Sequence, residues 1–91
     1  MWDVRQTRRF ARQYKKLQQK VAADVDQAVL TIQQDPKIGV SKKGDLAALR
    51  VFKFHSGSQQ YLLGYSLDEG IRLIYLEAVG PHENFYRDVK R

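Results

Sequence analysis

The sequence predicts an α+β fold: a small antiparallel sheet with an N-terminal helical hairpin packed on one face, in the order β-α-α-β-β-β, followed by a short C-terminal helix. Two observations predict this fold. Apolar residues recur at three- and four-residue steps through residues 10–32, and three closely spaced strand-like runs lie between residues 50 and 79. Early helices followed by late strands are typical of α+β domains. A chain of 91 residues allows one domain, spanning residues 1–91.

A short strand and a capped helix open the chain. Residues 2–6 alternate between apolar and polar side chains at their start, which indicates a strand. Thr7 is a residue type that caps helix N-termini. Asp35-Pro36 ends the helical pattern, because proline disfavours helix in the residue before it. The apolar helical face consists of Phe10, Tyr14, Leu17, Val21, Val25, Ala28 and Ile32.

The helical segment is too long to be one helix. A single helix over residues 7–34 would be about 42 Å long. A domain of this length has a radius of gyration of about 12 Å and is roughly 30 Å across. We therefore expect a break near residues 18–20 and a helical hairpin, although neither glycine nor proline marks the turn.

The second half of the chain is strand-like. A polar loop with a glycine near each end, residues 37–44, leads into it. Closely spaced strands separated by short turns pair as an antiparallel meander. Gly80-Pro81 ends the sheet, and residues 82–91 read as a short helix or an extended tail. The predicted strands span residues 50–54, 60–67 and 71–79, and the turns between them span residues 56–58 and 68–70.

Positive charge is concentrated in two segments. The net charge is +6, and residues 1–20 carry seven Lys or Arg against Asp3 alone. Residues 37–55 carry five against Asp45. We interpret the first segment as a solvated helix face and the second, in and beside a strand, as a surface for a polyanion.

The composition excludes several classes of protein. With no cysteine, the chain has neither disulfides nor thiolate metal sites. It shows neither a signal peptide nor an apolar run of the roughly 20 residues that a spanning helix needs. We therefore expect a soluble, cytoplasmic protein with no membrane partner. The two histidines are far apart in sequence, and no His/Asp/Glu set has metal-ligand spacing, so we expect no metal and no cofactor.

Four segments, in this order, resemble the RelE/ParE superfamily of toxins from type II toxin–antitoxin systems. Residues 10–17 (FARQYKKL) are similar to the first helix of these toxins, and residues 32–39 (IQQDPKIG) to the end of the second. Residues 43–54, with KGDL followed by LRVFKF, resemble the start of the sheet. Residues 80–86 (GPHENFY) resemble the C-terminal segment, where a basic residue or His follows a glycine and precedes a tyrosine.

The resemblance implies a concave basic surface on the sheet face opposite the hairpin, and a cognate antitoxin as partner. RelE-like members cleave messenger RNA on the ribosome, whereas ParE-like members poison DNA gyrase. We expect a metal-independent, ribosome-associated mRNA endoribonuclease, with ribosome and mRNA as partners. The alternative is a non-catalytic toxin that inhibits gyrase. Because one fold hosts both activities, the choice depends on the site.

RNA cleavage through the 2′-hydroxyl needs a base, an acid and cations that stabilise the phosphate. His82 is the natural acid or base, because histidine titrates near neutral pH; the alternative is that it caps the terminal helix. By the resemblance, Tyr86 lies near the cleaved phosphate, although Phe85 and Tyr86 could both anchor the helix to the sheet. Lys53 aligns with a strand lysine of RelE-like enzymes, and alternation places it opposite Phe52 and Phe54.

The sequence departs from the RelE-like pattern in the strand near Gln60, where those enzymes carry an arginine and this chain carries none. The phosphate would then be held by other cations, and the gyrase alternative stays open. Alternation along the strand places Arg50 on the same face as the phenylalanines. The lysines and arginines near the C-terminus could equally form a solvated tail that binds no phosphate. The candidate phosphate-binding residues are Arg50, Lys42, Lys43, Arg72, Arg87 and Lys90.

Overall fold

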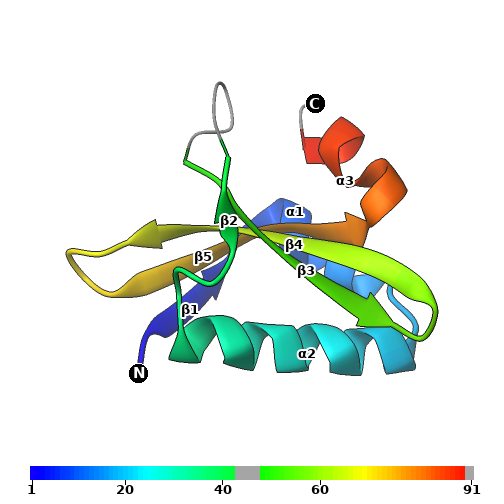
Figure 1. Ribbon diagram of the computed structural model, residues 1–91, viewed down its shortest axis with the longest axis horizontal. Coiled ribbons are helices and arrows are strands. Elements are labelled where there is room, and N and C mark those ends of the chain that lie inside the picture. Colours follow the sequence, from blue (N-terminus) through cyan, green and yellow to red (C-terminus); the bar gives the residue numbers. More distant parts are fainter. Residues whose placement is uncertain (43–47, 90–91) are drawn as a thin grey trace.

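The structure of the protein, a computed structural model, describes residues 1–42 and 48–89 (Figure 1). The predicted α+β fold is confirmed, with five strands and three helices among the described residues. In chain order these are β1 (Asp3–Gln6), α1 (Arg8–Lys15), α2 (Gln19–Gln34), β2 (Val40–Ser41), β3 (Arg50–Ser56), β4 (Gln59–Asp68), β5 (Leu73–Pro81) and α3 (His82–Val89).

The strands form one mixed sheet in the order β1-β5-β4-β3-β2. The predicted meander is present, because β3, β4 and β5 pair antiparallel in succession. Two features go beyond the sequence analysis. β1 pairs with β5 in parallel, so the sheet is mixed rather than purely antiparallel. The predicted loop before residue 44 contains the two-residue strand β2, which pairs with β3 at the opposite edge.

The helical hairpin forms as the size argument predicts. Thr7 caps α1, and its Oγ1 accepts a hydrogen bond from the backbone N–H of Phe10 at 3.1 Å. The break lies at residues 16–18, two residues before the predicted position. It keeps the molecule compact, with a Cα radius of gyration of 12.2 Å. No described helix is long and apolar enough to cross a membrane.

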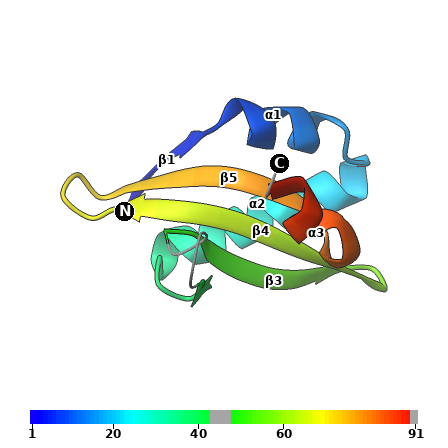
Figure 2. The same cartoon turned by 90° about the horizontal axis from the view of Figure 1, so that it is seen from above.

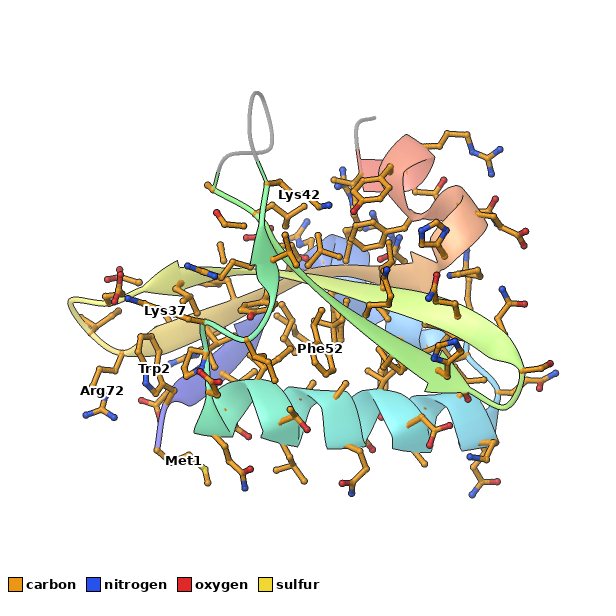
Figure 3. All side chains as sticks on the ribbon, in the orientation of Figure 1. Met1, Trp2, Lys37, Lys42, Phe52 and Arg72 are labelled. Carbon is orange, nitrogen blue, oxygen red and sulfur yellow. The ribbon has the colours of Figure 1, made fainter. Side chains whose placement is uncertain are left out.

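The hairpin covers one face of the sheet with an apolar core. In Figure 1, α2 runs below the strands and α3 stands above them; the view from above in Figure 2 shows α1 beyond the β1–β5 edge. Phe52 lies between the sheet and α2 (Figure 3). The buried residues of this cluster are Phe10, Val25, Ala28, Ile32, Leu63, Tyr65, Ile74, Leu76 and Val79.

A second, smaller cluster holds α3 on the other face. It contains five buried residues, Leu49, Val51, Leu62, Ala78 and Phe85. Phe85 is 2% exposed and packs directly over Gly64, where an added Cβ would lie 2.8 Å from its Cζ. At the far end of α3, the Arg9 guanidinium donates to the Val89 carbonyl at 3.1 Å. The helix therefore covers only part of this face and leaves the region beside β2 and β3 open.

Candidate active site

A groove of about 470 Å³ lies on the open face of the sheet, between α3 on one side and β2 and β3 on the other. Three of the sequence-predicted catalytic residues and one predicted phosphate ligand line it, although they come from separate parts of the chain. Its lining residues are Ile38, Val40, Lys42, Val51, Phe52, Lys53, Leu62, His82 and Tyr86.

His82 and Lys53 reach the groove from opposite walls. His82 is the first residue of α3, and its side chain is exposed. Lys53 is in the middle of β3 and is also exposed. Alternation along β3 places it opposite Phe52 and Phe54, as predicted, because those rings join the core beneath the sheet. These two residues thus give the groove an exposed imidazole and an exposed ammonium group.

Tyr86 and Lys42 meet across the mouth of the groove. The Lys42 ammonium lies 5.1 Å from the centre of the Tyr86 ring, within the range of a cation–π contact. In Figure 3, Lys42 lies above the sheet, on the same side as α3. Phe85 is the buried member of the pair of aromatic residues on α3; it meets the Tyr86 ring edge-on at 5.2 Å between centroids. Phe85 thus anchors the helix, and Tyr86 presents its ring to the groove.

None of the arginines proposed as phosphate ligands lines the groove. Arg50 has its guanidinium on backbone carbonyls of the loop after α2, at 2.9 Å from the Gly39 oxygen. Arg72 lies at the opposite end of the molecule, over the Trp2 ring (Figure 3), 5.8 Å from its centroid. Arg87 is exposed on α3 and donates to Asn84 at 3.0 Å. The described cations of the groove are therefore Lys42 and Lys53.

Two further candidates, Lys43 and Lys90, lie outside the described residues. Gln60, at the position where the family pattern has an arginine, pairs with His55 in the β3–β4 ladder. Neither Gln60 nor His55 contributes to the groove lining. Because this chain has glutamine where the family pattern has an arginine, the described positive charges of the groove are both lysines.

The groove also has an apolar wall that the sequence analysis missed. Ile38 and Val40 flank Gly39, and their side chains are 42% and 65% exposed. Together with the largely buried Val51 and Leu62 they form the apolar part of the groove lining. The alternation of Ile38 and Val40 around a glycine was the available signal, but two residues are too few to predict a strand.

The groove combines an acid–base side chain, two ammonium groups and an aromatic ring, so it has groups that can transfer a proton, stabilise an anion and stack on a planar ring. Within the residues that the structure describes, no group of three or more His, Asp or Glu side chains could hold a metal ion.

A sequence profile for the ParE-like toxin of type II bacterial toxin–antitoxin systems matches residues 4–90. The chain belongs to this family. Because the match spans nearly the whole chain, the toxin fold accounts for the hairpin, the sheet and α3 together. No curated protein matches the sequence of this ParE-like toxin.

Solved structures share the fold of the toxin at low sequence identity. Escherichia coli RelE in the intact RelBE toxin–antitoxin complex has a TM-score of 0.73 and 18% identity, and the match covers 88% of this chain and 95% of that one. The Mycobacterium tuberculosis RelBE2 complex gives 0.73 and 23%, with coverage of 89% and 98%. E. coli YafQ gives 0.60 and 14%, with coverage of 91% and 96%. The ParE-like toxin thus shares the fold of the RelE toxins over most of its length.

Proposed function

We propose that this toxin is a metal-independent endoribonuclease that cleaves messenger RNA on the ribosome and acts in the cytoplasm. The observation that carries the proposal is the groove itself. It gathers His82, Tyr86, Lys53 and Lys42 from α3, β3 and the residue after β2, whereas a solvated basic surface would need no such convergence. The chemistry follows from the side chains, and the ribosome follows from the resemblance to RelE-like enzymes.

Cleavage proceeds by attack of a ribose 2′-oxygen on the adjacent phosphorus. One groove residue takes the 2′-hydroxyl proton, and another gives a proton to the 5′-oxygen as its bond to phosphorus breaks. The products are a 2′,3′-cyclic phosphate and a free 5′-hydroxyl. His82 is suited to one of these transfers because imidazole both accepts and donates a proton near neutral pH. Tyr86 provides the partner hydroxyl, or a ring on which a base stacks.

The two lysines supply the positive charge that the phosphate needs as it becomes pentacoordinate. A lysine ammonium is a point charge and lacks the two-pronged geometry of a guanidinium. Two lysines from the β2–β3 side of the groove therefore take the place of the missing strand arginine. Since side chains provide both the proton transfers and the charge, no step requires a metal ion.

A cognate antitoxin is the second part of the proposal. The E. coli and M. tuberculosis relatives are solved as toxin–antitoxin complexes, and an archaeal RelE from Pyrococcus horikoshii is solved with RelB. With a net charge of +6, this toxin offers an acidic antitoxin a favourable electrostatic partner.

The test maps cleavage of a translated message in a reconstituted translation system by primer extension, beside a gyrase supercoiling assay. We expect new 5′ ends within translated codons and no loss of supercoiling. Tyr86→Phe and Tyr86→Ala separate the roles of the tyrosine: the first removes only the hydroxyl, and the second also removes the ring. Equal losses in both variants assign proton transfer to the hydroxyl, and a loss confined to Tyr86→Ala assigns stacking.

Two results would overturn the proposal. An intact message with blocked supercoiling would make the protein a gyrase inhibitor. Cuts that persist undiminished in both Tyr86 variants and in His82→Ala would leave an RNase whose site lies elsewhere.

A further inference from the structure

One phenol hydroxyl is buried in the otherwise apolar core beneath the sheet. Tyr65, on β4, is fully buried at 0% exposure. Its hydroxyl donates to the Pro36 carbonyl at 2.7 Å and accepts from the Gly39 N–H at 2.9 Å. Burial raises the pKa of the phenol, so the hydroxyl keeps the proton that it donates. Both hydrogen bonds join Tyr65 to the loop between α2 and β2, which precedes it by 26 to 29 residues in the sequence.

Arg50 holds the same loop through its carbonyls. Its Nη1 donates to Gly39 at 2.9 Å and to Lys37 at 3.3 Å. Gly39 is therefore fixed at both ends, its N–H by Tyr65 and its carbonyl by Arg50. The fit is tight, because an added Cβ at this position would lie 2.6 Å from the Tyr65 hydroxyl oxygen.

The fixed loop leads directly into the wall of the groove. Gly39 precedes β2, which is held to β3 by only two residue pairs, Val40 with Val51 and Ser41 with Arg50. The next residue is Lys42, whose ammonium lies over Tyr86. The backbone N–H of Lys42 also donates to the Leu49 carbonyl at 3.0 Å. This short edge strand thus makes few contacts of its own with β3, and the Tyr65 and Arg50 contacts add a second constraint on its position.

We propose that Tyr65 and Arg50 are positioning residues that fix β2 through Gly39 and thereby hold Lys42 in place against Tyr86. This inference rests on the proposed ribonuclease function for its effect on rate, but not for its effect on geometry. Arg50 is then a positioning residue that contacts no phosphate. A shift of about 1 Å in a charged group at an active site can cost up to a hundredfold in rate, so a distant hydroxyl is sufficient to matter.

The test is a double-mutant cycle between Tyr65→Phe and Lys42→Ala, read as single-turnover cleavage over a range of ribosome-complex concentrations. We expect Tyr65→Phe to reduce cleavage on the order of tenfold, chiefly by raising the half-saturating concentration. In the Lys42→Ala background the same change should cost almost nothing, because the group that it positions is gone. Arg50→Ala should behave like Tyr65→Phe, with partial rescue in Arg50→Lys.

The matched control is Tyr61→Phe, on the same strand. The Tyr61 ring stacks on Phe54 at 5.9 Å between centroids, and its hydroxyl has no hydrogen bond to any residue that the structure describes. This variant should cleave like the wild type. Thermal unfolding of each variant, with cleavage measured far below its Tm, removes loss of folded protein as an explanation.

A second measurement needs no activity. Because the Lys42 ammonium lies 5.1 Å from the centre of the Tyr86 ring, the ring current should shift the NMR signals of the Lys42 side-chain protons upfield. We expect Tyr65→Phe to abolish that shift and Tyr61→Phe to retain it. A shift that survives Tyr65→Phe overturns the inference whether or not the toxin cleaves RNA. The inference is also overturned if the losses from Tyr65→Phe and Lys42→Ala simply add in the double mutant. In the same cycle with Arg50→Ala in place of Tyr65→Phe, additive losses would indicate that Arg50 binds phosphate directly. Absence of cleavage by the wild type would refute the proposed function alone.

Discussion

The two faces of the sheet differ in how completely they are covered. Beneath the sheet, α1 and α2 seal nine buried residues into one apolar cluster. Above it, α3 is anchored by a cluster of five and leaves a groove with exposed His82 and Lys53. The covered face provides stability, and the half-covered face provides accessible chemistry. Substitutions on the two faces should therefore have separable effects on folding and on activity.

The largest separation is expected at His82. His82→Ala should slow RNA cleavage by at least about a hundredfold, because a positioned general acid or base contributes roughly that much or more. Its free energy of unfolding should change by less than about 0.5 kcal/mol, since the side chain is exposed. The measurements are single-turnover cleavage and urea unfolding.

His55→Ala is the matched control for His82. His55 is exposed on the same face, at the far end of β3, and does not line the groove. Equal losses of activity in the two histidine variants would refute the assignment of His82.

The reverse pattern is expected on the covered face. Ile32 is 0% exposed on α2, and Ile32→Ala should lower the free energy of unfolding by about 2–5 kcal/mol. Leu30, on the same helix, is 46% exposed, so Leu30→Ala should cost far less. Both variants should cleave RNA normally under conditions where they remain folded. A loss of activity in folded Ile32→Ala would show that the two faces are coupled.

Gly64 lies where α3 meets the sheet, so its substitution should affect both properties. An alanine Cβ there would lie 2.8 Å from the buried Phe85 ring and 3.1 Å from Leu49. Overpacking of this kind costs about 1–3 kcal/mol, and it should also displace Tyr86 with the helix. Gly80→Ala is the control, because nothing lies within 4 Å of its added Cβ. Normal cleavage by Gly64→Ala would indicate that α3 tolerates displacement.

The smallest effect concerns the end of the covered face, where Asp24 on α2 meets the β3–β4 hairpin. Hydrogen bonds from Ser56, at 2.6 Å, and from Lys20 lower the pKa of the Asp24 carboxyl. A lowered pKa means that its contribution to stability is present above the ordinary value of 3.8 and is lost as the pH falls through the lowered pKa. Ser56→Ala should move the pKa back toward 3.8 in an NMR titration, and an unchanged pKa would contradict this assignment.

Much of the architecture is predictable from local pattern and size. The length of the helical segment required the hairpin, because one helix would overhang its core. Alternation in β3 placed Phe52 and Lys53 on opposite faces, since buried rings and solvated ammonium groups separate on a strand. The groove residues His82, Tyr86 and Lys53 were named before their convergence was visible.

Contacts between residues far apart in the chain could not be predicted from local sequence patterns. Alternation along β3 placed Arg50 on the face of the phenylalanines. It could not predict that the Arg50 guanidinium donates hydrogen bonds to the loop carbonyls of Lys37 and Gly39. Arg72 looked available as a phosphate ligand until its position over Trp2, at the other end of the sheet, was known. β2 was missed because a two-residue strand has no periodicity, and the parallel pairing of β1 depends on a partner some 70 residues later.

That parallel pair has a consequence for the order of synthesis. Among the strands that the structure describes, β1 is made first, yet its neighbour β5 is made last. The Thr7 hydroxyl likewise has no partner to donate to until the carbonyls of Leu76 and Glu77 have been made. Contacts so distant in sequence form late and slowly. The N-terminal strand therefore emerges from the ribosome unpaired, and a truncated chain lacking β5 cannot complete the sheet on which α3 and the groove are built.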